Sequence, residues 1–204
     1  IMLDGWDLSK VLPEIEKRAV RYIEEQAEYQ NPFFLYFTLT APHTPIVPTK
    51  EHIGTSQAGP YGDFIHQVDA IVGNILNTLE RTGQAENTLV IFTSDNGSPR
   101  MDGTNMEGEM NSILKYGHNP SYIFSGVKAD IWEGGHRVPF FASWPGKITP
   151  GTKSAEIICH TDLLATCAAI LGQKLPDNAG EDSYSILSVL TGKSYEQPIR
   201  EATV

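Results

Sequence analysis

Two long segments of the chain carry apolar residues at the spacing of an amphipathic helix. In the first, from about residue 10 to residue 28, apolar side chains recur every three or four positions. Pro13 falls in the first turn, where a helix tolerates it. In the second, the same spacing runs from Phe64 to Leu79, and Gly83 follows where a left-handed residue would end the helix. The pattern therefore predicts two helices.

Three short apolar runs are interspersed with these helices. Phe33–Leu39 is a continuous apolar run between Asn-Pro and Ala-Pro pairs, which is typical of a strand buried on both faces. Thr88–Thr93 and Val138–Trp144 are further apolar runs of strand length. Because strands that alternate with helices favour crossover connections, we expect an α/β fold with a layered sheet.

The remaining segments are less regular. Between residues 98 and 125 the periodicity disappears. A loop of this length is uncommon inside a compact domain and usually functional, so we expect it to form a wall of a substrate cleft. Further on, Thr161 is predicted to cap a helix that ends at Gly172, and residues 185–190 are predicted to form a shorter helix.

Composition narrows the class of protein. The 204 residues are 40% hydrophobic and 20% charged, without an apolar stretch of membrane-spanning length, so a soluble globular protein is expected. The formal net charge of -10 disfavours a nucleic-acid partner, which needs a basic face. An anionic substrate must therefore be held by a few local cations or a metal ion.

The cysteines and the first residues of the chain give less information about the class of protein. Cys159 and Cys167 do not form a zinc-binding or disulfide pattern, and two buried, inert thiols are the favoured interpretation. The chain begins at Ile1 without a basic and apolar leader. Either a signal peptide has been removed or the chain is a fragment, and we favour the fragment.

Oxygen ligands for a metal ion follow the run Thr88–Thr93. Asp95 and Asn96 stand at the expected C-terminal end of a strand, where open α/β sheets assemble ligand sites, and Gly97 supplies freedom for the backbone to turn. A carboxylate and an amide oxygen suit Ca²⁺, or less well Mg²⁺. By itself the motif is more often an ordinary Asp-Asn-Gly turn.

Three basic residues are candidates for binding an anion. His43 lies between Pro42 and Pro45, after the run Phe33–Leu39, and an imidazole there can donate to an anionic oxygen or a leaving group. Lys128 offers a compact cation for a tetrahedral oxyanion, close to a pair of glycines at 134 and 135. His136 is either a pocket wall that binds substrate or a structural residue. For His43 and Lys128 the alternatives are a packed loop histidine and a solvated surface lysine.

Several motifs, taken in order, resemble the sulfatase family. Each is weak alone, but the ordered set is specific and spans roughly residues 8 to 192. They are the segments 32–37, 41–45 (Ala-Pro-His-Thr-Pro), 59–61, 87–97 (ending in Ser-Asp-Asn-Gly), 126–128 (Gly-Val-Lys), 133–135 (Glu-Gly-Gly), 144–146 and 162–166.

The resemblance implies an alkaline-phosphatase-like α/β fold, with a central, mostly parallel sheet flanked by helices and here incomplete. It implies a sulfuric ester hydrolase that uses calcium and a formylglycine nucleophile made from Cys or Ser. By position, Asp95 and Asn96 match metal ligands, whereas His43 and Lys128 match residues that contact the sulfate group and help the alcohol leave. The substrate would be a sulfated small molecule or glycan, and the protein would be periplasmic, extracellular or lysosomal.

The sequence departs from the family pattern in two places. The Cys/Ser-x-Pro/Ala-x-Arg motif of the nucleophile is absent, as are the paired N-terminal acidic metal ligands. We therefore expect residues 1–204 to be the C-terminal portion of the catalytic domain, with a smaller subdomain starting near residue 173, and to be inactive alone. The alternatives are a phosphodiesterase or phosphonate hydrolase of the same superfamily, or a non-catalytic relative that binds sulfated glycans.

Overall fold

The chain forms two compact units in the computed structural model, which describes residues 5–29, 31–99, 115–193 and 197–203. The first unit comprises Ile1–Ala85 and Phe92–Phe140, and the second comprises Glu86–Ile91 and Phe141–Val204. A subdomain boundary near residue 173 stays a prediction. Among the described residues, no helix has the length and apolar character needed to span a membrane.

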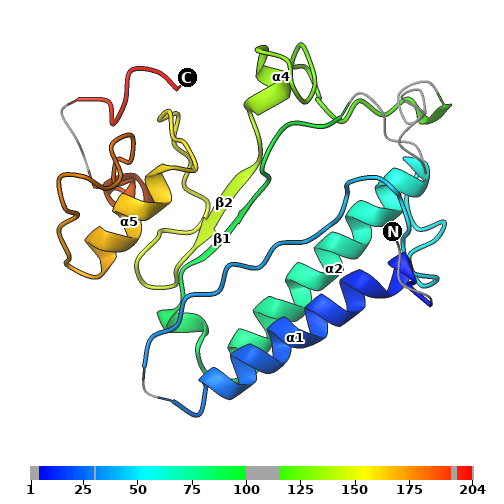
Figure 1. Ribbon diagram of the computed structural model, residues 1–204, viewed down its shortest axis with the longest axis horizontal. Helices are drawn as coiled ribbons and strands as arrows, with labels where there is room; N and C mark the ends of the chain where they lie inside the picture. Colours follow the sequence, from blue (N-terminus) through cyan, green and yellow to red (C-terminus); the bar gives the residue numbers. More distant parts are fainter. Residues whose placement is uncertain (1–4, 30, 100–114, 194–196, 204) are drawn as a thin grey trace. The chain divides into compact units, whose positions relative to one another are not determined.

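Two long helices dominate the first unit, as the apolar spacing predicts (Figure 1). A short 3-10 helix, Leu8–Lys10, leads into α1, Val11–Gln26, and α2 spans Gly59–Arg81. Gly83 has a φ of +72°, and the Gly83 and Gln84 amides donate to the Glu80 and Leu79 carbonyls at 3.0 and 2.8 Å. The prediction that Gly83 ends the second helix is therefore confirmed. A left-handed residue lets the following backbone amides donate to the last carbonyls of the helix.

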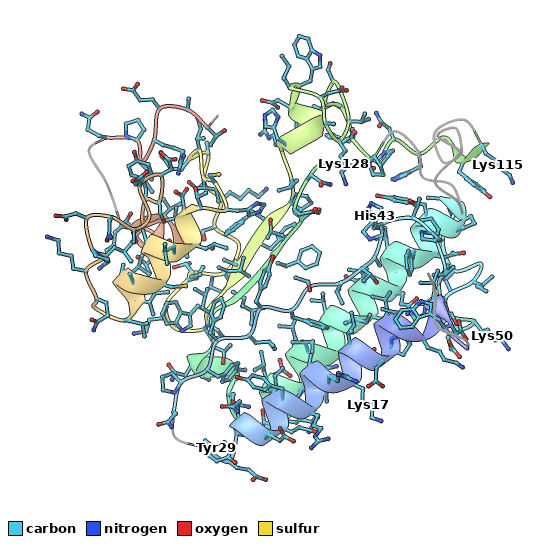
Figure 2. All side chains as sticks on the ribbon, in the orientation of Figure 1. Lys17, Tyr29, His43, Lys50, Lys115 and Lys128 are labelled. Atoms are coloured by element: carbon cyan, nitrogen blue, oxygen red, sulfur yellow. The ribbon has the colours of Figure 1, made fainter. Side chains whose placement is uncertain are left out.

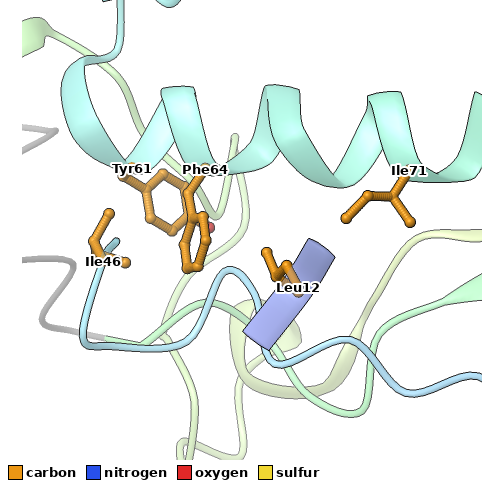
Figure 3. Packing of buried hydrophobic residues seen from close by; sticks show 5 residues of the cluster. All are labelled: Leu12, Ile46, Tyr61, Phe64 and Ile71. Atoms are coloured by element: carbon orange, nitrogen blue, oxygen red, sulfur yellow. The ribbon is translucent and has the colours of Figure 1, made fainter. Parts of the chain in front are cut away.

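An apolar cluster holds the two helices and the loop between them together (Figure 3). Polar contacts support it at two points: Asn74 Nδ2 donates to Glu16 Oε1 at 2.6 Å, and Gln84 Nε2 donates to the Ile23 carbonyl at 3.0 Å. The second bond adds a side-chain donor to a carbonyl in the last turn of α1, which also accepts from the Ala27 amide at 3.1 Å. The cluster consists of Leu12, Ile46, Tyr61, Phe64 and Ile71.

Residues 33–39 are extended but form no strand, so the prediction of a strand buried on both faces is wrong for these residues. Their burial alternates: Phe37 and Leu39 pack on the core, whereas Phe34 and Tyr36 are 76% and 79% exposed. The physical reason is that a strand needs a hydrogen-bonded neighbour. In the described part of the chain, no backbone hydrogen bond joins this segment to a neighbour.

The other two apolar runs do become strands. β1, Val90–Thr93, follows a short 3-10 helix at Ala85–Asn87, and it pairs with β2, Phe140–Ser143, in a two-stranded sheet. A one-turn helix, α4, occupies Glu133–His136. The loop predicted for residues 98–125 falls largely on residues 100–114, which lie outside the described residues.

The second unit is built on α5, Asp162–Ile170, and the short helix α6, Leu187–Leu190. Gly172 has a φ of +64° just after α5, as predicted. Thr161 occupies the N-cap position but makes no side-chain cap, because its hydroxyl donates instead to the Asp182 carbonyl at 3.1 Å. The free cysteines at 159 and 167 are half-buried, so the prediction of two buried thiols is wrong in that respect.

A buried carboxylate organises this second unit. The Asp162 side chain is completely buried and accepts hydrogen bonds from the Cys159 and Tyr184 amides at 2.7 and 3.0 Å. It also forms an ion pair with Arg200, whose side chain is 10% exposed. One side chain thereby ties three separate stretches of backbone to the start of α5.

Candidate active site

The Asp95–Asn96 pair lies in a bend just after β1, as the sequence predicts. Thr93 Oγ1 donates to the Pro139 carbonyl at 2.9 Å, and Ser94 Oγ donates to the Asn96 carbonyl at 3.0 Å. Asn96 Nδ2 donates to the Gly97 carbonyl at 3.1 Å, which uses the nitrogen end of the amide. The amide oxygen is thereby left as the end that can accept or ligate.

Gly97 is required here for close approach of backbone. It does not have a positive φ, so the left-handed freedom expected of it is not what the bend uses. A Cβ at this position would lie 1.9 Å from the Gly134 carbonyl oxygen, far inside contact distance. The Gly97 amide donates to the Gly135 carbonyl at 2.9 Å, and this bond joins the Asp-Asn-Gly bend to the Glu-Gly-Gly turn.

Lys128 is fastened to the same bend through its backbone. Its amide donates to the Ser98 carbonyl at 2.7 Å. The turn that carries it is closed by Asp130, whose amide donates to the Val127 carbonyl and whose carboxylate accepts from the Val127 amide, at 2.9 and 3.1 Å. Lys128, labelled in Figure 2, is half-buried. Within the described ranges its ammonium makes no hydrogen bond or ion pair.

The paired glycines explain how these turns can pack so closely. A Cβ on Gly134 would lie 2.1 Å from the Gly126 carbonyl oxygen, and one on Gly135 would lie 2.2 Å from that of Asp130. The Gly134 amide donates to the Ser125 carbonyl at 2.8 Å. Only residues without a Cβ fit at these two positions. We call residues 94–98, 125–130 and 132–137 together the turn cluster.

His43 follows the extended segment in a loop bracketed by cis peptide bonds at Pro42 and Pro45. Its imidazole is exposed, and Nδ1 lies 2.7 Å from the Thr44 carbonyl oxygen. Because a carbonyl only accepts, Nδ1 carries a hydrogen. The other nitrogen, Nε2, is therefore an acceptor in the neutral ring and a donor once the ring is protonated.

Two buried polar residues of α2 hold the loop that follows His43, and sequence analysis missed both. The Asp63 carboxylate accepts from the Gly54 and Ser56 amides, each at 2.8 Å, and Gln67 Oε1 accepts from the Thr49 amide at 2.9 Å. Asp63 and Gln67 are each 3% exposed. The available signal was that Asp63 immediately precedes the second predicted helix and Gln67 lies within it, next to apolar residues, since buried polar groups need partners.

The other charged residues near the glycine pair have local partners. Arg137 donates to Glu133 at 2.7 Å across α4, an exposed ion pair, and its guanidinium lies 4.7 Å from the centre of the Phe124 ring. This ion pair joins the first and last residues of the segment 133–137. His136 is exposed on α4. Its role in binding substrate stays a prediction.

The structure thus joins Asp95, Asn96 and Lys128 in one hydrogen-bonded backbone assembly. In the described residues, no hydrogen bond links His43 to that assembly, whereas His136 belongs to α4 and so to the turn cluster. The same residues contain no group of three or more His, Cys, Asp or Glu that could hold a metal ion. Asp95 and Asn96 fit calcium as two oxygen donors, but Ca²⁺ takes six to eight oxygens, so further ligands must come from elsewhere.

Comparison with known proteins defines the class. The family model for Sulfatase matches residues 14–173, and the chain belongs to this family. It is 37% identical over 190 residues to an N-acetylgalactosamine-6-O-sulfatase of Bacteroides thetaiotaomicron, covering 93% of this chain and 36% of that protein. It is 35% identical over 184 residues to the human N-acetylgalactosamine-6-sulfatase, covering 90% of this chain and 33% of the relative.

Solved structures agree on the fold. A sulfatase from a Bacteroides thetaiotaomicron locus for metabolism of multiple glycosaminoglycans superposes with a TM-score of 0.83 and 36% identity, covering 93% of this chain and 38% of that chain. Ps i-CgsB in complex with a neocarrahexaose superposes with a TM-score of 0.76 and 26% identity, covering 93% of this chain and 41% of that chain. The alkaline-phosphatase-like fold predicted from the motifs is therefore confirmed. The chain spans about a third of the length of the curated relatives it matches.

Proposed function

We propose that the full-length protein is a sulfuric ester hydrolase that cleaves a sulfate ester of a carbohydrate or aryl alcohol to the alcohol and inorganic sulfate. The observation that carries this proposal is the backbone assembly that holds the Asp95–Asn96 bend and Lys128 together in a chain of the Sulfatase family. A sulfate ester is anionic, and this assembly presents both metal-type oxygens and a cation in a protein whose net charge is -10.

Lys128 binds and orients the sulfate group in this proposal. Its backbone is fixed by the Ser98 carbonyl, and its stem is half-buried, so the ammonium has less conformational freedom to lose on binding than a fully solvated lysine. Within the described ranges no carboxylate pairs with this ammonium, so none there competes with the ligand for it. The charge then opposes the negative charge that builds up as the ester bond breaks.

His43 supplies the proton for the leaving alcohol. With Nδ1 donating to the Thr44 carbonyl, a protonated ring presents its second proton at Nε2. Transfer of that proton to the bridging oxygen lets the alcohol leave neutral, and the ring returns to the neutral form with its Nδ1 hydrogen bond intact.

Two groups expected of this family complete the proposal. Asp95 and Asn96 would hold Ca²⁺ together with acidic residues outside residues 1–204, and the ion would neutralise charge on the sulfate oxygens. A formylglycine outside this chain would provide the nucleophile. We also expect the protein to act on a sulfated small molecule or glycan in an exported compartment. The names of its relatives support a glycan: one is an N-acetylgalactosamine-6-O-sulfatase, and one structure holds a neocarrahexaose.

The test is release of inorganic sulfate by the full-length protein from an aryl sulfate and from N-acetylgalactosamine 6-sulfate. Lys128→Ala keeps the backbone amide that bonds to Ser98, and we expect it to lower kcat/KM by about 100-fold or more. Lys17→Ala, on the exposed surface of α1, is the matched control and should leave kcat/KM unchanged.

Phosphate esters of the same alcohols separate sulfatase from phosphodiesterase or phosphonate hydrolase activity. Faster turnover of phosphate esters or diesters than of sulfate esters would contradict the proposal. Binding of a sulfated glycan without release of sulfate would point instead to a non-catalytic relative.

A further inference from the structure

A pocket of about 510 Å³ lies at the start of α5 in the second unit. Small-molecule sites in proteins usually have volumes of about 300–1,000 Å³, so this pocket is large enough for a small ligand. Two stretches of chain line it, the beginning of α5 and the loop that follows this helix (Figure 1). The lining includes His160, Leu164, Asn178, Glu181 and Asp182.

Hydrogen bonds between the two stretches fix the shape of the pocket. Thr161 Oγ1 donates to the Asp182 carbonyl at 3.1 Å, and Ser183 Oγ donates to the Thr161 carbonyl at 2.6 Å. Ser183 Oγ also accepts from the Ala165 amide at 2.9 Å, and the Asp182 carbonyl accepts from Arg200 at 3.0 Å. Because the walls are already held together, a ligand that enters has little ordering of the protein to overcome.

Three polar side chains of the lining are available to a ligand. Asn178, Glu181 and Asp182 are exposed, and within the described ranges their side chains make no hydrogen bond or ion pair. Each carboxylate offers a pair of acceptor oxygens, and the amide of Asn178 offers both a donor and an acceptor. Leu164, which is 50% exposed, adds an apolar surface to the same lining.

The charge of the lining narrows the class of ligand. Among the described residues that line the pocket are two carboxylates and no Lys or Arg, so a sulfate or phosphate group would be repelled. A neutral sugar fits these groups better. Carboxylate and amide side chains can hydrogen-bond to neighbouring hydroxyl groups of a sugar ring, while the C–H face of the ring contacts an apolar side chain such as Leu164.

We propose that this pocket binds a neutral sugar unit. Glu181 and Asp182 accept hydrogen bonds from its hydroxyl groups, Asn178 bonds to a further hydroxyl, and Leu164 packs against its C–H face. The sugar is either a free saccharide or an unsulfated unit of a glycan chain. None of the lining residues belongs to the turn cluster, so this proposal does not depend on the proposed hydrolase activity.

Saturation-transfer NMR on the full-length protein tests the proposal, with galactose, glucose, mannose and the disaccharide lactose as probes. We expect saturation transfer to at least one of these sugars. Glu181→Ala should weaken its binding by about 10-fold or more, because hydrogen bonds to a charged group are lost, and Asn178→Ala should weaken it less. Asp177→Ala is the matched control, because Asp177 is exposed in the same loop but lies outside the lining, and it should leave the affinity unchanged.

The length of the probe separates the two sources of the sugar. Tighter binding of lactose than of galactose and glucose supports a unit of a glycan chain, whereas equal affinities support a free saccharide.

Three results would overturn the proposal. They are no saturation transfer to any of the four sugars, binding that Glu181→Ala leaves unchanged, and tighter binding of the diamine putrescine than of any sugar, which would show a site for cations. Lys128→Ala should leave sugar binding unchanged while it lowers sulfate release. Failure of this pocket and failure of the proposed function are therefore separate results.

Discussion

The ion pair between Arg200 and Asp162 shows how strongly one contact can hold the second unit. The Asp162 side chain is fully buried and that of Arg200 is 10% exposed. The guanidinium also donates to the Asp182 carbonyl at 3.0 Å and lies 4.9 Å from the centre of the Tyr184 ring. These contacts bring residues from the end of the chain onto the start of α5.

Arg200→Met keeps an unbranched apolar stem and removes the charge. Of the donors in the described part of the chain, the buried Asp162 carboxylate then retains two backbone amides, at Cys159 and Tyr184. Removing one partner of a buried pair costs about 3–5 kcal/mol. Because the two amides still stabilise the anion, we expect the lower end, about 3 kcal/mol, or on the order of a 100-fold fall in the folding equilibrium constant.

The assay is denaturant unfolding of the full-length protein, with hydrogen exchange at the Tyr184 amide as the local readout. Arg18→Met is the control, because Arg18 pairs with Glu14 at 2.8 Å on the exposed surface of α1, and such pairs contribute less than about 1 kcal/mol. Adding Asp162→Asn to Arg200→Met removes the unpaired charge. The double variant should therefore lose less unfolding free energy than Asp162→Asn and Arg200→Met lose in sum as single variants. If Arg200→Met lowers the unfolding free energy by no more than Arg18→Met does, the stabilising role inferred for the Arg200–Asp162 ion pair is wrong.

Two further predictions concern the turn cluster and a thiol. Gly97→Ala would place a Cβ 1.9 Å from the Gly134 carbonyl oxygen, so we expect a loss of about 1–3 kcal/mol in unfolding free energy and a lower kcat/KM. Gly73→Ala is the control, because Gly73 lies in α2 with nothing within 4 Å of the added Cβ. It should instead raise the unfolding free energy by about 0.5–1 kcal/mol. Equal effects of the two substitutions would contradict the inference that Gly97 is required for close packing. Hydrogen bonds from the Thr161 side chain and backbone lower the pKa of the Cys159 thiol. A lowered pKa populates the thiolate at lower pH, so alkylation by iodoacetamide should rise at a lower pH at Cys159 than for N-acetylcysteine, and a rise at the same or a higher pH would refute it.

The sequence by itself determined the long helices and the family. The apolar spacing placed α1 and α2 to within a few residues, and Gly83 and Gly172 marked the ends of α2 and α5. These features are local, because helix hydrogen bonds join residues four apart in sequence. The ordered motifs around Asp95 and Lys128 likewise indicated the sulfatase family, and the match of the family model to residues 14–173 confirms it.

Only the tertiary structure decided which groups are buried and what they contact. Nothing in the local sequence distinguishes Asp162, yet Arg200, 38 residues away, pairs with it in the interior of the second unit. Gly97 read as a flexible turn residue, yet it is needed because Gly134 packs against it. Residues 33–39 read as a finished strand, although strand pairing depends on residues distant in sequence. Long-range packing and hydrogen bonding leave no local pattern, which is why these three features could not be predicted from spacing or composition.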